Sequence, residues 1–547
     1  HALLIMGGIY LLGVLAAALY TQLMAVLAQK IQLSLRKKMF AHMQTLAINY
    51  FDRNNFGDLM SRYTNDIDAL LQMIMQSFPQ FVSALFNIAF VTAGMLYLSP
   101  FLTIVSFVIF AISIVFLNFL SKRSSKYFNQ QQETIGALDA QIEEILNGQK
   151  VVKVFSHEKQ VEDQFNKLND DWAEASGKAN GYATMLFPFM GNLGTILYVL
   201  IAIIGGFLTL KGYSALTLGT IAAFLQLSRS FSRPIAQISQ QLNNIILALA
   251  GGKRIFELLD AQPEVDNGTV DLVRVTHQNG QLIETTDSRH DEWAWKDGSK
   301  FVPLQGKVDF QHVDFGYFKD KTILHDVNLK VKPGQKVALV GPTGAGKTTI
   351  TSMLNRFYEI DQGKITYDGI NIQRIKKEAL RRSLGIVLQQ TNLFTGTVME
   401  NIRYGRLDAT DDEVIAAAKL ANADLFIQEL PYGYQTMITG DGSDLSQGQR
   451  QMLSIARAAL ADPPVMILDE ATSSIDTQTE RKVQGAMDNL MKGRTSFVIA
   501  HRLSTIFNSD LIVVVEDGKI IEQGSHEELI AQRGKYFQLY TGALTLE

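Results

Sequence analysis

The stretch that decides the fold of the second half of the chain reads Lys336-Val-Ala-Leu-Val-Gly341-Pro-Thr-Gly-Ala-Gly-Lys347-Thr-Thr349. An apolar strand pattern, Lys336–Val340, leads into the spacing G-x-x-x-x-G-K-T, and a helix-compatible run, Thr349–Phe357, follows. Glycines let backbone N–H groups approach phosphate oxygens, and the start of the next helix adds the positive end of its dipole. The pattern therefore predicts a strand, loop and helix that bind nucleotide phosphates. The predicted binding residues are Gly341, Pro342, Thr343, Gly344, Ala345, Gly346, Lys347, Thr348 and Thr349.

A second apolar strand ends in two acids. Val465-Met-Ile-Leu precedes Asp469 and Glu470, and ligands bind at the carboxyl ends of such strands in open α/β sheets. Lys347 is expected to reach the β- and γ-phosphates, Thr348 and Asp469 to hold Mg²⁺, and Glu470 to polarise the attacking water. Two surface acids at a strand end would be the alternative, but the wholly apolar strand before them disfavours it. The second half therefore reads as an α/β P-loop NTPase domain.

The first half is dominated by stretches without Asp, Glu, Lys or Arg. They include residues 2–29, 69–121, 179–210 and 212–228. An apolar segment of about 20 residues is what a membrane-spanning helix requires. We predict five spans, near residues 3–29, 78–98, 101–121, 183–210 and 214–238, the last continuing to about residue 250. The predicted fold class is a multidomain membrane protein, with an all-α transmembrane helical bundle and an α/β nucleotide-binding domain.

The loops predict the orientation. Residues 30–68 and 122–178 are long and rich in Lys and Arg, whereas the connections near Ser99-Pro100 and residues 211–214 are short and carry at most one charge. The positive-inside rule puts the long ones in the cytoplasm, as helical extensions, together with the nucleotide domain. The chain is thus expected to be a multi-pass protein of a bacterial cell membrane. Five spans would leave His1 outside, so we expect a first helix of six to be missing from the sequence.

The two halves suggest three regions. We assign residues 1–257 to the membrane domain, 258–305 to a linker and 306–547 to the nucleotide-binding domain. Within the linker, alternating patterns at Val270–Val275 and Gln281–Thr285 are compatible with a small β-hairpin, and a flexible linker is the open alternative. The absence of cysteine excludes disulfides and thiolate sites in this sequence, and the net charge of −4 gives no reason to expect a nucleic-acid partner.

Between the two nucleotide motifs stands Leu445-Ser-Gln-Gly-Gln449. Upstream of a strand ending in Asp-Glu, it resembles the signature of ATP-binding cassette (ABC) proteins. The resemblance implies that Ser446, Gln447, Gly448 and Gln449 contact a nucleotide held by a second subunit. It further implies that Tyr317 stacks on adenine, that Gln389 is the Q-loop residue and a Mg²⁺ ligand, that Asp476 lies in the D-loop, and that His501 is the switch histidine. The implied catalytic residues are Glu470, His501, Lys347 and Gln389, and the cofactors are ATP and Mg²⁺.

The membrane half resembles an exporter of this family. Phe51-Asp-Arg53 with Gly57-Asp-Leu59 is similar to the first intracellular loop, where a coupling helix lies. A membrane domain and a cassette on one chain are typical of a half-transporter, which needs a second homologous subunit. Importers usually keep the two domains on separate chains, and soluble ABC ATPases of DNA maintenance lack spans.

Two departures from the family pattern predict unequal subunits. Gln447 stands where the common signature has glycine, and Gly440 stands at or near the position of a glutamate that exporters usually carry. A side chain at residue 447 is expected to weaken the close approach of backbone to phosphate. We therefore expect a heterodimer resembling bacterial multidrug exporters, in which this chain supplies the catalytic residues of the competent site. A homodimer that tolerates Gln447 is the alternative.

The identity of the substrate is what the sequence constrains least. Spans rich in Phe and Met suit varied apolar ligands, so the sequence favours export of hydrophobic or amphipathic compounds, as in multidrug efflux. Ordinary contacts with membrane lipid and between helices explain the same residues. Arg229 and Arg233 are costly in lipid and are expected to face the cavity or its cytoplasmic mouth, where they attract anions or pair with acids. A lipid or peptide exporter, and an ATP-regulated channel or sensor, stay as alternatives.

Overall fold

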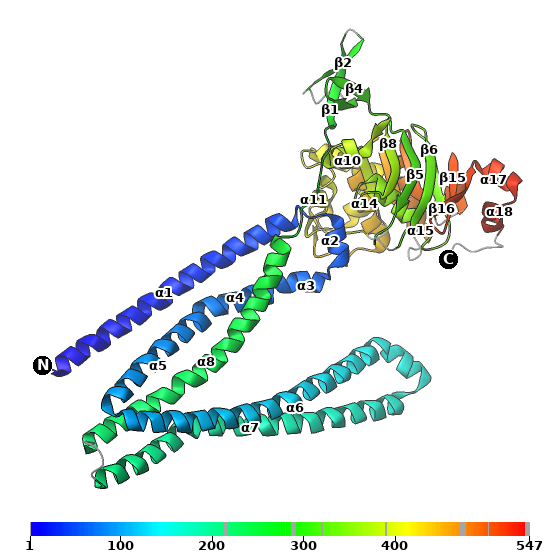
Figure 1. Cartoon of the computed structure of the whole chain (residues 1–547). Helices are drawn as coiled ribbons and strands as arrows, with labels where there is room; N and C mark the ends of the chain where they lie inside the picture. Colours follow the sequence, from blue (N-terminus) through cyan, green and yellow to red (C-terminus); the bar gives the residue numbers. More distant parts are fainter. Residues whose placement is uncertain are drawn as a thin grey trace. The chain divides into compact units, whose positions relative to one another are not determined.

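The computed structural model describes residues 2–211, 217–278, 280–285, 292–318, 321–388, 391–469, 477–500 and 503–541, with backbone alone at a few helical positions. The chain forms two compact units. One comprises His1–Thr45 and Asn54–Gln262, and the other comprises Leu46–Arg53 and Pro263–Glu547. In the described residues the first unit is helical, whereas the second is built on β-sheets (Figure 1).

The first unit consists of long helices, drawn in blue to green in Figure 1. Their bounds are α1 (Ala2–Met43), α3 (Phe56–Ser61), α4 (Ile67–Gln72), α5 (Phe78–Leu98), α6 (Pro100–Phe155), α7 (Glu158–Leu210) and α8 (Leu218–Leu259), with π-helical turns η1 (Arg62–Asp66) and η2 (Met73–Ser77). Each predicted span lies in one of α1, α5, α6, α7 and α8, apart from residues 214–216, which lie outside the described set, and Thr217, which caps α8. The last helix extends nine residues beyond the expected end at residue 250.

Helix length and composition alone identify fewer spans than the charge pattern. Among the described residues, two stretches are long and apolar enough to cross a membrane, Leu3–Met43 and Phe56–Leu98. Pro100–Ile112 and Thr195–Leu210 are shorter apolar stretches. The intervening parts of α6 and α7 contain residues whose side chains are not described. Length and composition therefore identify the spans in α6 and α7 only in part.

The turn between α5 and α6 forms at Ser99-Pro100, as the sequence predicted. Ser99 has an extended backbone (φ −163°), and its hydroxyl accepts a hydrogen bond from the N–H of Leu102. Pro100 occupies the first position of α6, where its fixed φ is favourable and its missing N–H is not needed. One serine and one proline thus end one helix and start the next.

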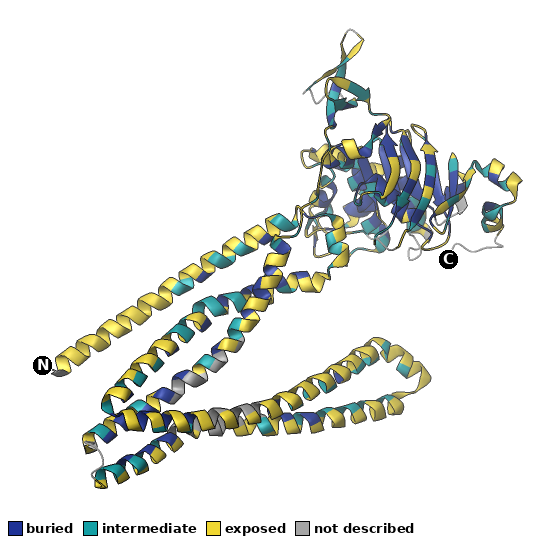
Figure 2. Cartoon of the chain, in the orientation of Figure 1, coloured by how far each residue is buried: buried dark blue, intermediate teal, exposed yellow. Residues whose placement is uncertain are grey.

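The first unit buries little of its apolar surface within itself. A core of α5, α6, α7 and α8 residues contains Met95, Leu102, Phe110, Leu197, Ile201 and Phe224, among others. Figure 2 shows that α1, α6 and α7 are mostly exposed, and within the predicted spans many exposed side chains are large and apolar, such as Leu3, Leu15 and Phe119. Helices that are apolar around their circumference need lipid or another protein to cover them.

The second unit contains a parallel sheet next to an antiparallel one. The parallel sheet has the order β10-β13-β14-β7-β15-β16, with β16 antiparallel at its edge, and the antiparallel sheet has the order β6-β5-β8-β9. Their strands are β5 (Val308–Phe315), β6 (Leu324–Val331), β7 (Lys336–Val340), β8 (Gln362–Tyr367), β9 (Ile370–Asn371), β10 (Leu384–Val387), β13 (Val465–Asp469), β14 (Thr495–Ile499), β15 (Leu511–Glu516) and β16 (Lys519–Gly524). A further pair joins β11 (Gly396–Thr397) to β12 (Met437–Ile438). The central strands are buried, as Figure 2 shows.

Helices complete this unit. They are α2 (Ile48–Arg53), α9 (Lys347–Leu354), α10 (Lys377–Arg382), α11 (Val398–Arg403), α12 (Asp411–Leu420), α13 (Asp424–Glu429), α14 (Gln447–Ala461), α15 (Thr477–Met491), α16 (Leu503–Phe507), α17 (His526–Gln532) and α18 (Lys535–Tyr540), with 3₁₀ turns η3 (Ile372–Arg374) and η4 (Gly433–Gln435). Helix α9 starts two residues before the predicted Thr349 and ends three residues before Phe357. Its end is set by Arg356, whose φ of +49° takes the backbone out of the helical region.

Residues 271–303 form a sheet of their own. Strands β1 (Asp271–Gln278), β2 (Gln281–Glu284), β3 (Trp293–Asp297) and β4 (Lys300–Pro303) pair in the antiparallel order β2-β1-β3-β4. The strand alternative for this region is therefore the one found, with two strands more than a hairpin. Trp295 is fully buried, and its indole N–H donates to Asp368 at 3.0 Å. That bond and the Trp295–Tyr367 ring contact attach the sheet to the rest of the unit.

Candidate functional site

The predicted site residues gather at one edge of the parallel sheet. In the register of its strands, Asp469 at the end of β13 lies opposite Ile499 of β14, and Ile499 lies opposite Leu339 of β7. Gly341 therefore follows β7 at the same edge where Asp469 ends β13. This is the carboxyl edge, where open α/β sheets bind ligands. Gln389, Glu470, Asp476 and His501 follow strands or precede α15 in sequence, but they lie outside the described residues.

The phosphate loop, residues 341–347, has a conformation that its glycines make possible. Gly341 has φ +150°, and a Cβ there would lie 2.0 Å from the carbonyl oxygen of Val515. Gly344 has φ +82°, and no heavy atom lies within 4 Å of its Cβ direction. Pro342, Thr343 and Gly344 are exposed. The loop is thus held against β15 at one end and open to a ligand in its middle.

Lys347 is a buried cation that donates hydrogen bonds to backbone carbonyl oxygens. The residue is 6% exposed, and its Nζ donates to the carbonyl oxygens of Gly341 at 2.7 Å and Pro342 at 2.8 Å. Burial lowers the pKa of Lys347, and the charge of Asp469 partly opposes that change. Carbonyl dipoles satisfy the N–H groups of the ammonium but do not neutralise it. A nucleotide polyphosphate would place negative charge against this ammonium, so the loop fits that ligand.

The remaining residues fit Mg²⁺ held jointly with phosphate. Thr348 is exposed at the second position of α9, and Asp469 is half-buried at the end of β13. Over the described part of the chain, no cluster of three His, Asp or Glu side chains could hold a metal ion. Mg²⁺ is commonly held by one or two carboxylates together with substrate phosphates, which agrees with this sparse set.

Tyr317 lies against the phosphate-loop helix. Its hydroxyl is 3.2 Å from Oγ1 of Thr349, and its ring makes edge-to-face contacts with Phe315 and Tyr358 at centroid distances of 5.0 Å each. The ring is half-buried, so part of it is available to a ligand. The structure therefore brings Tyr317, predicted to stack on adenine, next to the loop predicted to bind phosphate.

Sequence reasoning did not identify the polar contacts of α2 with this region. The guanidinium of Arg53 donates to the carbonyl oxygen of Tyr317 at 3.1 Å and lies over the ring of Phe318. The hydroxyl of Tyr358 donates to the carboxylate of Asp52, and burial together with that carboxylate raises the pKa of Tyr358. Residues 46–53, assigned to the membrane domain within 1–257, thus pack with the second unit. The Phe51-Asp-Arg53 motif marked the segment, but nothing in the sequence marked Tyr358 as its partner.

The signature residues form the beginning of α14. Ser446 caps the helix, because its hydroxyl accepts from the N–H of Gln449 while the side-chain carbonyl of Gln449 accepts from the N–H of Ser446. This reciprocal pair is a capping box, which the S-x-x-Q spacing could have revealed. Gln447 is the first helical residue and is half-buried, and Gly448 is buried. Among the described residues, no hydrogen bond joins residues 446–449 to the phosphate loop.

The other departure from the family pattern lies just before the signature. Gly440 is exposed with φ +58°, and its N–H donates to the hydroxyl of Thr395 at 3.1 Å. A glutamate at this position would have to adopt a left-handed backbone conformation that L side chains rarely adopt. Asp441, which follows it, is also exposed.

Comparison with protein families matches both units. Residues 1–235 match the family described as ABC transporter transmembrane region, and residues 324–473 match the family described as ABC transporter. An ABC transporter ATP-binding protein of Bacillus subtilis, YfiC, is 41% identical over 98% of this chain and 84% of its own length.

Other relatives carry names that specify a cargo. A fatty acid ABC transporter ATP-binding/permease protein of Mycobacterium bovis is 38% identical over 97% of this chain and 79% of its own length. An ATP-dependent lipid A-core flippase of Desulfotalea psychrophila is 35% identical over 95% of this chain and 86% of its own length. Among solved structures, a bacterial Atm1-family ABC exporter with ATP bound aligns with a TM-score of 0.68 at 27% identity, covering 95% of this chain and 86% of that one.

Proposed function

This chain belongs to the ABC transporter family, as an exporter that couples ATP hydrolysis to transport across a membrane, and we propose that it is one of two different subunits of an exporter for amphipathic compounds with an anionic head group. Exporters of this family act as dimers, and their nucleotide-binding units are typically cytoplasmic. The proposal concerns the cargo, the partner and the roles of individual residues.

The observation that carries the cargo class is a cation, Arg229, within the predicted membrane span of α8. Arg229 is exposed within α8, and its guanidinium lies over the ring of Tyr198 of α7 at 4.7 Å. An arginine in a membrane helix is costly unless it faces a polar cavity or a partner. An anionic head group would pair with the guanidinium while the apolar helices around it cover a hydrocarbon tail. The relatives named for fatty acid and lipid A-core export support lipid-like cargo over unrelated drugs. The side chain of Arg233 lies outside the described set.

The residues of the phosphate loop would hold ATP and orient it. Lys347 neutralises phosphate charge, the N–H groups of residues 343–348 donate to phosphate oxygens, and Tyr317 supports the adenine. Mg²⁺ bound with ATP supplies positive charge against the charge that develops on the transferred phosphate, and Thr348, Asp469 and Gln389 would hold it. Glu470 orients the attacking water and His501 contacts the γ-phosphate, as the family resemblance implies.

The signature supports two different subunits. In this family the signature of one subunit completes the nucleotide site of the other, so Gln447 belongs to the site whose phosphate loop the partner supplies. A side chain at the first position of α14 adds bulk where the common form has glycine. We infer that this chain contributes the catalytic residues of the competent site and caps a slower one. Intact mass of the complex purified from its host would show two different subunits, and one species at twice the subunit mass would contradict the heterodimer.

Transport by the reconstituted complex tests the cargo. Liposomes that contain the complex would be assayed for ATP-dependent transport of a fluorescently labelled fatty acid. The cationic dye Hoechst 33342 would be assayed separately. Arg229→Gln is expected to lower fatty-acid transport by about tenfold and to leave dye transport unchanged. Lys211→Gln is the matched control, because Lys211 makes a similar contact with the ring of Phe207. Glu470→Gln serves as the variant without turnover.

Three outcomes would count against the proposal. Transport of the dye without the fatty acid would favour multidrug efflux. Equal loss of both probes in Arg229→Gln would mean that the arginine supports the helix bundle and does not select cargo. Equilibration of either probe without accumulation would favour an ATP-regulated channel.

A further inference from the structure

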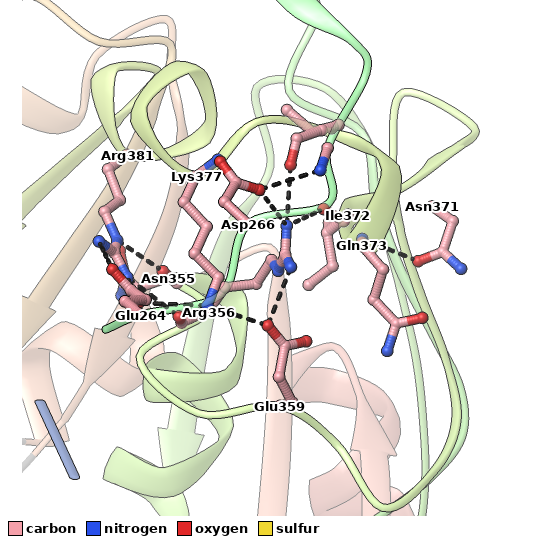
Figure 3. A network of polar contacts seen from close by, with 12 residues as sticks. Glu264, Asp266, Asn355, Arg356, Glu359, Asn371, Ile372, Gln373, Lys377 and Arg381 are labelled. Atoms are coloured by element: carbon pink, nitrogen blue, oxygen red, sulfur yellow. Dashed lines mark hydrogen bonds and ion pairs between the residues drawn. The ribbon is translucent and has the colours of Figure 1, made fainter. Parts of the chain in front are cut away.

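A network of charged side chains joins the segment that follows the last membrane helix to the nucleotide-binding elements. Helix α8 ends at Leu259, and the second unit starts at Pro263. Glu264 and Asp266 of this segment, here called the linker acids, lie among Arg356, Lys377 and Arg381, with Glu359 as the third acid (Figure 3). None of these residues belongs to the nucleotide site described above.

Glu264 is the member with the strongest contacts. Its two oxygens accept from Nη1 of Arg381 at 2.9 Å and Nη2 of Arg381 at 2.6 Å, and Nζ of Lys377 lies 3.2 Å away. The side chain is 18% exposed. Burial works to raise the pKa of Glu264, but the bonds from Arg381 and Lys377 outweigh it and hold the pKa below its usual range. A two-pronged arginine–carboxylate pair of this kind fixes direction as well as distance.

Arg381 passes this contact on to the phosphate-loop helix. It donates to the carbonyl oxygens of Asn355 at 3.4 Å and Arg356 at 3.1 Å, and it lies over the ring of Phe357. Those carbonyls stand at the C-terminal end of α9, where a cation satisfies unpaired groups and the helix dipole. Helix α9 has eight residues, a rod of about 12 Å, and Lys347 begins it. The linker residue Glu264 is therefore connected, through Arg381, to the C-terminal end of α9.

The linker acids also hold the element that leads to Gln389. Asp266 accepts from the backbone N–H of Lys377 at 2.8 Å, at the start of α10. Nζ of Lys377 is shared between Glu264 and Glu359 at 3.2 and 3.1 Å. Helix α10 passes through Ser383 into β10, and Gln389 follows β10 two residues later. One segment thus contacts Arg356, just beyond the end of α9, and Lys377 and Arg381 of α10, the helix that precedes Gln389.

Arg356 is the most buried cation of the network shown in Figure 3. It is 4% exposed, donates to the carbonyl oxygens of Ile372 at 2.9 Å and Ile375 at 2.8 Å, and pairs with Glu359 at 2.9 Å. Asp266 lies 3.9 Å from the same guanidinium. Buried charges with several fixed partners cannot shift one at a time without leaving a charge unpaired, so the group moves as a unit.

We propose that Glu264, supported by Asp266, is a positioning residue that couples the segment leaving the last membrane helix to the phosphate-loop helix and to α10, so that ATP-driven movement of these elements is transmitted to the membrane helices. The linker acids touch neither nucleotide nor cargo. Their removal should leave ATP binding intact and disconnect it from the membrane domain.

The test uses the full complex with its partner in lipid nanodiscs. Tyr97→Cys, at an exposed position next to the turn between α5 and α6, introduces a single cysteine into a 547-residue sequence that has none, and this cysteine carries a bimane fluorophore. The change in bimane fluorescence on adding Mg-ATP reports the membrane domain. The affinity for TNP-ATP reports the nucleotide site on the same sample.

Glu264→Gln, and Glu264→Gln combined with Asp266→Asn, are compared with Asp297→Asn. The control removes a carboxylate that pairs with Arg374 at 2.8 and 2.9 Å, on the same stretch of chain but without contact to α9 or α10. Without the linker acids, we expect the fluorescence response to fall at least about fivefold while nucleotide affinity stays within about twofold. Asp297→Asn should keep both.

Two results would overturn the proposal. An undiminished response in the double variant would show that the linker does not transmit the movement and that α2 suffices. A parallel loss of affinity and response would show that the acids only keep the nucleotide unit folded. Insertion of Gly-Ser between Gln262 and Pro263, which leaves the network intact, should reproduce the loss of response, and a normal response there would also contradict the proposal.

Discussion

The phosphate-loop helix α9 and the signature helix α14 begin in opposite ways. The residue before α9 is Gly346, which has no side chain to cap the first N–H groups, whereas Ser446 and Gln449 form a capping box at the start of α14. The uncapped start of α9 leaves its first N–H groups for a ligand, whereas the capping box of α14 pairs the N–H groups of Ser446 and Gln449 within the chain. One chain therefore carries one half-site whose helix start depends on phosphate and one whose helix start is capped by its own side chains.

The two half-sites, the phosphate loop with α9 and the signature with α14, also differ in how closely their sequences match the family motifs. The phosphate loop keeps every residue of its motif, and its glycines occupy positions where a Cβ would collide with the chain or needs a rare φ. In the signature, the changed residue is Gln447, which stands outside the capping pair. Ser446 and Gln449 form the capping box that starts the helix, and Gln447 between them replaces the common glycine. The helix can thus tolerate Gln447 even though the nucleotide contact changes.

The largest effect on ATP turnover should come from a change in the phosphate loop, at the uncapped start of α9. Lys347→Ala removes the buried ammonium, so ATP turnover of the complex is expected to fall by about 100-fold or more, because developing phosphate charge loses its main protein cation. The measurement is steady-state phosphate release. Lys364→Ala, on the exposed face of β8, is the matched control and should change nothing. Turnover within about threefold of the wild type would mean that this chain's phosphate loop does not belong to the competent site.

An intermediate effect should come from the capped half. Ser446→Ala breaks the capping box of α14, and Ser525→Ala breaks the equivalent box of α17. Both should lower the free energy of unfolding by about 1 kcal/mol, measured by thermal denaturation. Turnover should stay within about twofold in both variants, because Ser446 belongs to the signature that caps the slower site of the proposed heterodimer. A loss of turnover by about tenfold, confined to Ser446→Ala, would place this signature at the competent site and contradict the assignment.

Short-range patterns in the sequence determined how much of the fold and of the candidate site could be predicted. The strands Lys336–Val340 and Val465–Asp469, the turn at Ser99-Pro100 and the long helices follow from apolar periodicity and local backbone preference. The partnership of Asp52 with Tyr358, and of Glu264 with Arg381, joins residues more than one hundred positions apart. Neither residue of such a pair has a local pattern that names the other. The four-stranded sheet at 271–303 was only partly visible, because Trp293–Pro303 has no alternation of apolar and polar residues as clear as that of β1.

The smallest effect should come from Gln447, and its size separates the two models of the dimer. In a heterodimer whose competent site is capped by the partner's signature, Gln447→Gly alters only the slower site, so turnover should stay within about twofold. In a homodimer Gln447 would lie in both sites, and restoring the close approach of glycine should raise turnover several-fold. Glycine at the first helical position also costs about 1 kcal/mol of helix stability. Gln447→Ala removes the side chain without that cost, so a rise shared by both variants points to released phosphate contact. A rise of that kind would mean that the capped half limits the rate, and the assignment of this chain to the competent site would have to be withdrawn.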